Sequence, residues 1–310
     1  MKLTAKNLLF AGYFATMLTL TLIRVLFALD IFEVETSSLF SVLAQFVAMG
    51  IVPITFTILS SSRQRDRGYF ASTMRIGERT PIKIWIAVVV LGIAQLMLNG
   101  ISSNVWQSML DVIGFTKPHS IPNTYSTTSA LIVGILLTGI LPAIFEEITH
   151  RGMLMSAVGR ESSLSTILIS ALAFALMHQN IVQQAHTFVG GVIFGMVALY
   201  TGNILCAMLL HAMNNIYVVL STHATYNGGI MADIQKFFVD LYFGGETWVR
   251  VLLTALVVSA TVVAGVYIYK HRVPTTPSTP MSSVDKVFFS SALILGLGGV
   301  VMTLVAGLLR

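Results

Sequence analysis

Residues 145–151, FEEITHR, place two adjacent glutamates, a histidine and an arginine directly after a long apolar stretch. A charged side chain at the bilayer centre costs about 2.5–3.5 kcal/mol on insertion scales, so it is usually paired or functional. Glu147 and Arg151 are spaced i, i+4 with the acid first, which favours an ion pair. Glu146 lies about 100° around the helix from Glu147. We therefore expect one carboxylate to be neutralised within the helix and the other to point elsewhere.

Two later apolar stretches also carry polar side chains at helical spacing. They are FALMH, with Phe174 and His178, and HAMNN, with His211, Asn214 and Asn215. At 1.5 Å per residue, Glu146 and His178 both lie ~22–26 Å along their helices from the short turn GRESS near residue 161. His211 and Asn215 lie ~14–20 Å along their helix from the next turn on the same side of the membrane, which is near Gly202. We expect these side chains to converge in one buried, wet cavity.

Several of these residues also have a structural interpretation. A single intramembrane histidine is often a hydrogen-bonded packing group, and the Glu147–Arg151 pair is expected to be structural rather than catalytic. His119, His150 and His186 are expected to have structural or surface roles. The structural interpretation weakens when four polar groups on three helices share one depth.

The composition is that of an integral membrane protein. The chain has 310 residues, of which 55% are hydrophobic and 10% are charged, whereas a soluble domain has about 25% charged residues. The single cysteine, Cys206, excludes an internal disulfide framework and a thiolate metal site.

Nine stretches are candidates for spans, since a helix needs roughly 20 mostly apolar residues to cross a bilayer. They are 8–29, 37–60, 84–104, 129–157, 163–178, 184–201, 203–221, 248–269 and 287–309. The sequence thus predicts an all-α polytopic membrane bundle of eight or nine transmembrane helices. The fifth stretch is short and runs into HQNIVQQAH (178–186), which is too polar to face lipid and should line a cavity or be covered by protein.

Basic residues gather in particular connections between the spans. They are Lys2, Lys6, Arg63, Arg65, Arg67, Arg75, Arg79, Lys83, Lys270 and Arg272. The connection at 30–35 is acidic, and the loop 222–247 is mixed with more acids than bases. Because basic loops stay on the cytoplasmic side, nine crossings would place the N-terminus in the cytoplasm. The net charge of +5 then reflects topology, and no nucleic-acid partner is expected.

The chain divides into three parts on this basis. Residues 1–128 hold the first spans and the basic loop, 129–221 hold the polar motifs, and 222–310 hold an extracytoplasmic loop and the last spans. Within the last part, 274–283 (PTTPSTPMSS) is expected to be a flexible linker.

Three motifs occur in order on successive apolar helices: E-E-x-x-x-R (Glu146, Glu147, Arg151), F-x-x-x-H (Phe174, His178) and H-x-x-x-N (His211, Asn215). Together they resemble the CPBP family, the CAAX protease and bacteriocin-processing membrane proteins, also called Abi proteins. The resemblance covers about 129–221. It implies a catalytic core of four helices and an intramembrane glutamate-dependent endopeptidase that needs no metal or other cofactor.

The resemblance also implies roles for individual residues. Glu146 with His178 would bind and activate a water, and His211 with Asn215 would form an oxyanion hole. The supporting residues would be Glu147, Arg151, Phe174 and Asn214. The chemistry is reasonable, because a carboxylate in a poorly solvated cavity is a usable general base. Imidazole and amide N–H groups suit a tetrahedral oxyanion, and removing one such donor typically lowers turnover ~10²–10³-fold.

Other functions remain open on the sequence alone. Two histidines and a glutamate can form a catalytic zinc site, although H-E-x-x-H does not occur. Intramembrane Glu and His also form proton relays in transporters, although no internal repeat is visible. A non-catalytic scaffold that regulates a sensor kinase or an immunity protein is a further alternative.

For the peptidase, the expected partners are a peptide or protein precursor at the membrane and the lipid bilayer itself. Family members process prenylated CAAX tails or bacteriocin and signalling-peptide precursors. The small polar loops and the large hydrophobic fraction favour a bacterial cytoplasmic membrane and disfavour CAAX substrates. The sequence leaves the oligomeric state open.

Overall fold

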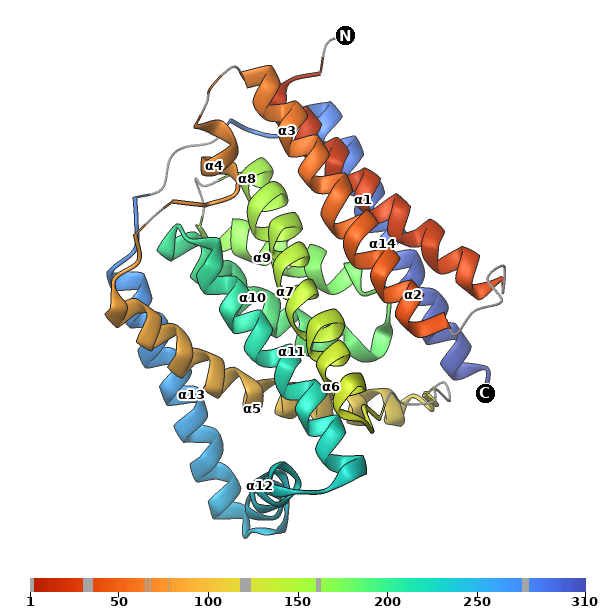
Figure 1. Ribbon diagram of the computed structural model, residues 1–310, viewed down its shortest axis with the longest axis vertical. Coiled ribbons are helices and arrows are strands. Elements are labelled where there is room, and N and C mark those ends of the chain that lie inside the picture. The colour runs from red at the N-terminus through yellow and green to blue at the C-terminus, as the bar shows by residue number, and fades with distance from the viewer. Residues whose placement is uncertain are drawn as a thin grey trace.

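The computed structural model describes residues 3–29, 36–64, 66, 68–77, 79–117, 124–159, 163–274 and 279–310 (Figure 1). Every regular element in these ranges is a helix, so the expected all-α fold is confirmed. Eight helices are long and apolar enough to cross a membrane: Ala5–Ala28, Leu39–Gln64, Ile82–Val112, Thr128–Val158, Ile181–Thr201, Ile204–Asn227, Thr247–Lys270 and Ser283–Leu308. The chain is therefore a multi-pass membrane protein.

Several spans consist of more than one element. The N-terminal part contains α1 (Ala5–Ala28), α2 (Thr36–Val42), η1 (Leu43–Ile51), α3 (Val52–Gln64), α4 (Tyr69–Thr73) and α5 (Ile82–Val112). The middle part contains α6 (Thr128–Gly134), η2 (Ile135–Ile140), α7 (Leu141–Glu147), η3 (Ile148–Leu154), α8 (Met155–Val158), α9 (Ser163–Met177), η4 (Ile181–Gln183), α10 (Gln184–Thr201) and α11 (Ile204–Asn227). The C-terminal part contains α12 (Ile230–Val239), η5 (Asp240–Gly244), α13 (Thr247–Lys270) and α14 (Ser283–Leu308).

The fifth predicted span, 163–178, is the exception among the nine. Its helix, α9, has 15 residues, which is ~22 Å of helix against a hydrocarbon core of about 30 Å. It therefore falls short of a full crossing. The chain turns at 178–180 before η4, and that turn is inside the protein. The Ile181 N–H donates to the Thr303 hydroxyl, and Trp106 donates to the Ile181 carbonyl. The expectation that the polar segment 178–186 lines a cavity or is covered by protein is thus confirmed: His178, Gln183 and His186 line a cavity, and the turn is held by these hydrogen bonds.

Basic residues mark one end of the bundle. There, the Lys6 ammonium group contacts the Thr279 carbonyl, and Val273 N–H donates to the Tyr200 carbonyl at the end of α10. We call this end, defined by the segments 61–83, 201–204 and 270–283, the basic end. In Figure 1 the N-terminus and α4 lie at this end, whereas α6, α12 and the C-terminus lie away from it.

The helix that carries FEEITHR contains two π-helical segments within its α-helical course. Segments η2 and η3 are π-helical and flank the α-helical turn α7, which holds Glu146 and Glu147. Pro142 stands at the start of α7 and has no N–H to donate, which disrupts the regular hydrogen-bond ladder there. Single π turns inside α-helices frequently mark functional sites, and here they enclose the two acids.

Gly191 lets α9 and α10 approach closely. A Cβ at Gly191 would lie 2.9 Å from the Cα of Ala171 in α9, so a side chain there would push the two helices apart. A Cβ at Gly195 would lie 3.2 Å from the methyl group of Met155 in α8.

The connections differ from expectation in two places. The loop predicted at 222–247 contains α12 and η5, and the basic segment 61–83 contains α4. Some residues used in the topology argument lie outside the described residues: Lys2, Asp30, Glu33, Glu35, Arg65, Arg67, His119, most of the GRESS turn and 275–278 of the linker.

Candidate active site

Glu147 and Arg151 form the ion pair that their spacing predicted. Arg151 Nη1 lies 2.8 Å from Glu147 Oε1, and both side chains are fully buried. Arg151 Nη2 also donates to the Gly191 carbonyl at 2.9 Å, which joins this helix to α10. The guanidinium carbon lies 4.6 Å from the ring centre of Phe174. Since a buried charge is tolerated when it is paired and hydrogen-bonded, these contacts explain how Arg151 is accommodated.

Glu146 points to a different neighbour, as its position around the helix predicted. Its Oε1 accepts a hydrogen bond of 2.9 Å from the amide of Gln45 in η1. Its Oε2 lies 3.8 Å from Nε2 of His211. The side chain is buried but lines a cavity, so it is the carboxylate available to a ligand.

His211 lies between the two carboxylates. Its Nδ1 is 2.9 Å from Glu147 Oε1, and its ring stacks on Phe194 with centroids 4.9 Å apart. The Glu147 carboxylate accepts this hydrogen bond, so Nδ1 is the donor and Nε2 faces Glu146. The imidazole is therefore fixed in position, in tautomer and in direction.

The buried cluster therefore gathers two carboxylates, Glu146 and Glu147, around one guanidinium, Arg151, with the His211 imidazole between the two acids. Because buried charges are costly unless they are paired and hydrogen-bonded, these contacts hold the four side chains as one unit.

His178 and Asn215 are oriented by neighbours on their own helices. The His178 Nδ1–H donates to the Phe174 carbonyl at 2.9 Å, which leaves Nε2 as an acceptor. The Asn215 side-chain oxygen accepts from the Asn214 amide at 3.0 Å, and the Asn214 oxygen accepts from Asn99 at 2.6 Å. The Asn215 amide nitrogen is on the other branch of that side chain and remains a donor for a ligand.

One cavity of about 580 Å³ connects these groups. Glu146, His178, His211 and Asn215 all line it, together with Phe174 and Asn214. The spacing argument thus placed four side chains from three helices correctly around one space. Their depths along the helices, read from the sequence, were sufficient for that placement.

The cavity has further polar lining that the motifs did not indicate. It comes from α5, from η4 and from the start of α10: Gln95, Asn99, Ser103, Gln183, His186 and Thr187. Gln45, which bonds Glu146, was also missed. Each is a polar side chain inside or beside an apolar stretch, which was the available signal. His186, expected to be structural, lines the cavity and contacts the Ser103 hydroxyl at 3.0 Å. His150 is structural, with Nδ1 bonded to the Glu146 carbonyl.

A comparison with protein families identifies the part of the chain that carries these motifs. Residues 128–217 match the family model described as type II CAAX prenyl endopeptidase Rce1-like. These residues form an Rce1-like domain. The family is one of membrane-embedded CAAX endopeptidases, so the resemblance drawn from the three motifs is confirmed. Neither the curated proteins nor the solved structures gave a match.

The Rce1-like domain covers the helices from α6 into α11, which are three spans and the shorter helix α9. Two contributions to the site come from outside it. Gln45 in η1 bonds Glu146, and α5 forms one wall of the cavity. Side chains from the N-terminal helices therefore contribute to the surroundings of the cavity.

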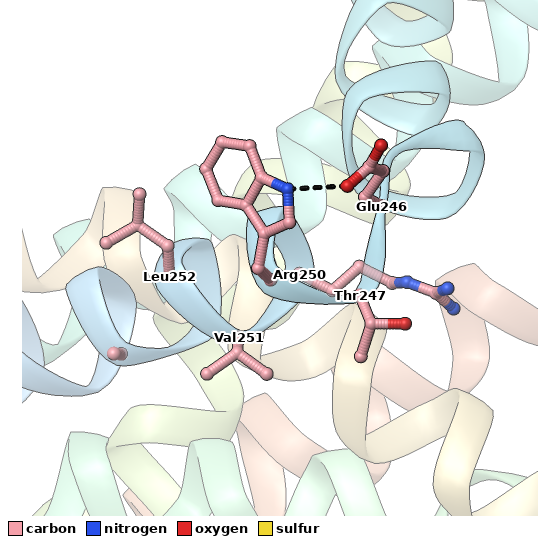
Figure 2. Close-up of a pocket in the computed structure, with 7 residues that line it drawn as sticks. Glu246, Thr247, Arg250, Val251 and Leu252 are labelled. Atoms are coloured by element: carbon pink, nitrogen blue, oxygen red, sulfur yellow. Dashed lines mark hydrogen bonds between the residues drawn. The ribbon is translucent and has the colours of Figure 1, made fainter.

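No group of three or more His, Cys, Asp or Glu side chains in the described part of the chain is arranged to hold a metal ion. A second hollow, of about 930 Å³, lies at the start of α13 (Figure 2). Its Glu246 carboxylate accepts from the Trp248 indole at 2.8 Å, and Trp248 is 63% exposed. This hollow is open and lined mainly by apolar side chains, so it lacks the converging polar groups of the first cavity.

A segment of the basic loop clamps the Rce1-like domain at its basic end. Arg75 is buried, and its Nε donates to the Arg151 carbonyl at 2.9 Å. Its own carbonyl accepts from the Ile204 N–H at the start of α11. Because Ile204 begins the helix of His211, Arg75 connects the helix of the two glutamates to the helix of His211 and Asn215.

Replacing Arg75 with alanine is expected to lower the free energy of unfolding by about 1.5–3 kcal/mol, the usual range for a hydrogen bond to a charged group. The measurement is thermal unfolding in detergent. Arg79→Ala is the matched control, since Arg79 is an exposed arginine of the same loop, and its effect should stay within about 0.5 kcal/mol. Equal effects of the two variants on the free energy of unfolding would show that the hydrogen bonds of Arg75 do not stabilise the protein.

Proposed function

We propose that the chain is an intramembrane endopeptidase that cleaves a membrane-associated peptide or protein precursor, with Glu146 as its general base. One observation carries the proposal: Glu146, His178, His211 and Asn215, from three helices, line a single cavity. A general base must reach the proton it removes either directly or through one water, and this cavity has space for both water and a peptide bond. The Rce1-like match supports the same reaction class.

The reaction begins with a water held by the Glu146 carboxylate and the free Nε2 of His178. Glu146 takes one proton from this water, and the water oxygen adds to the carbonyl carbon of the substrate. The tetrahedral intermediate carries its negative charge on the former carbonyl oxygen. When the C–N bond breaks, Glu146 returns the proton to the leaving nitrogen, which gives an amine and a carboxylic acid.

The oxyanion is stabilised by two donors. The Asn215 amide is one, held in place by the Asn99–Asn214–Asn215 chain of hydrogen bonds. His211 is the other when its Nε2 also carries a proton, and the Glu147 carboxylate at Nδ1 then balances the imidazolium. Donors that are fixed before the reaction stabilise the transition state without reorganisation. The buried Glu147–Arg151 pair fixes His211 in this way.

The substrate class and the setting follow from the same features. The cleaved segment is part of a peptide or protein that lies in or on the bilayer, since the cavity is enclosed by membrane helices. The basic end faces the cytoplasm under the positive-inside rule, which puts the N-terminus there. The sequence favours a bacterial cytoplasmic membrane. The chemistry uses protein groups and water, so cleavage should persist in a strong chelator.

The test is mass spectrometry of secreted and membrane-bound peptides from cells that carry either the wild-type protein or Glu146→Gln. Peptides with new termini should appear only with the wild type, and their precursors should accumulate with the variant. Glu246→Gln, an exposed glutamate outside the cavity, should leave the pattern unchanged. Identical peptide patterns for wild type and Glu146→Gln would contradict the proposal and would favour a non-catalytic role. pH-driven solute uptake into proteoliposomes would instead favour a transporter.

A further inference from the structure

The cavity is closed toward the basic end. Phe174, Phe194 and His211 form its innermost lining, and all three are buried. Phe194 and His211 each lie ~10 Å along their helices from the 201–204 turn. Beyond them toward the basic end stands the fully buried Arg151, whose carbonyl accepts from Arg75. Packed side chains therefore separate the catalytic groups from the basic loops.

The lining becomes more exposed in the opposite direction. Tyr217 and Val218 are 39% and 50% exposed, and Val218 lies ~21 Å along α11 from Ile204. On α5 the lining ends at Gly100, which is exposed, and Ser103, which is half-buried. The polar lining at Gln183 belongs to η4, which directly precedes the end of α10 that is farthest from Thr201. With distance from the basic end, the lining changes from buried to exposed on α11 and from buried Phe194 to half-buried Gln183 along α10 and η4.

The polar character of this outer lining agrees with access by water and peptide. Asn99, Ser103, Gln183 and His186 surround the outer part of the cavity, where apolar side chains would be expected if it faced only lipid. Two of them bond each other, His186 and the Ser103 hydroxyl at 3.0 Å. A polar mouth lets a peptide backbone keep hydrogen-bonding partners as it moves toward Glu146.

We propose that the cavity opens to the membrane face opposite the basic loops, and that its substrate is therefore an exported segment presented at the extracytoplasmic face. That a substrate enters this opening rests on the proposed function. The opening itself rests on the burial gradient and the charge distribution. A peptide that remains in the cytoplasm, such as the tail of a cytoplasmic lipidated protein, would meet the closed side.

The test is labelling with a membrane-impermeant maleimide. In a Cys206→Ala background, single cysteines are introduced at the mouth, as Ser103→Cys and Gln183→Cys, and at the basic end, as Arg79→Cys and Lys270→Cys. All four positions lie outside the proposed catalytic groups. In intact cells the two mouth cysteines should be labelled and the two basic-end cysteines should not. In inverted membrane vesicles the pattern should reverse.

The natural cysteine supplies the matched control. Cys206 is fully buried, so the unmodified protein should remain unlabelled in both preparations. Labelling of all four introduced cysteines from the same side would overturn the inference. So would mouth cysteines that react with neither the impermeant reagent nor a permeant maleimide, since the mouth would then be closed to water. Labelling needs no substrate and no catalysis, so its result is separable from the peptide comparison that tests the proposed function.

Discussion

Replacing Glu146 with glutamine is expected to lower the rate of peptide cleavage in proteoliposomes by about 10²–10⁴-fold, the usual contribution of a positioned general base. Glutamine keeps the size of the side chain and can still accept the hydrogen bond from Gln45. It cannot take a proton from water. The measurement is the initial rate of cleavage of the precursor identified by the peptide comparison, with the wild type and the variant at equal protein-to-lipid ratio.

The loss must come from chemistry rather than from unfolding. The Glu146→Gln variant should keep the wild-type unfolding temperature in detergent, because glutamine has the size of glutamate and keeps the hydrogen bond from Gln45. Glu246→Gln again serves as the control and should cleave at the wild-type rate. A Glu146→Gln protein that is folded and cleaves within about threefold of wild type would exclude the general-base role.

The second large effect is on stability. Glu147→Gln is expected to lower the free energy of unfolding by about 3–5 kcal/mol, the usual result of removing one partner of a buried ion pair. The Arg151 guanidinium would remain fully buried and would lose its carboxylate at 2.8 Å. A guanidinium cannot give up its proton to become neutral, so the cost cannot be relieved by titration.

A double-mutant cycle identifies the source of that effect. Arg151→Met alone leaves Glu147, whose carboxyl group can take up a proton and still bond His211, so it should be less harmful than Glu147→Gln. Combining the two substitutions should recover part of the stability, because no buried charge is then left without its partner. Thermal unfolding of the four proteins in one detergent gives the cycle. Strictly additive effects would show that the pair does not act as a unit.

Most of the correct predictions came from the spacing of residues within one helix and from their depth along it. The i, i+4 spacing of Glu147 and Arg151 placed their ion pair, and the rise per residue placed Glu146 and His178 beside one cavity. Both depend on local helix geometry, which a sequence specifies directly. The eight long spans followed from length and hydropathy for the same reason.

The contributions from distant helices could not be predicted in this way. The bond from Gln45 to Glu146 joins residues 101 positions apart, and the contact of Arg75 with Arg151 joins residues 76 positions apart. Each depends on which helices become neighbours, and periodicity within one helix contains no such information. The shortness of the fifth stretch was visible in the sequence, but the partners of its polar turn were not, because Trp106 and Thr303 are distant along the chain.

The π turns around α7 make the site sensitive to chain length as well as to residue type. A π turn contains one residue more than an α turn, so deleting a single residue within η2 would let the helix regain regular geometry. Every preceding side chain would then rotate by about 100° relative to Glu146. The motif would still be present in the sequence, but Glu146 would face a different neighbour. Relatives that differ by one residue in this helix would therefore be expected to differ in which glutamate reaches the cavity.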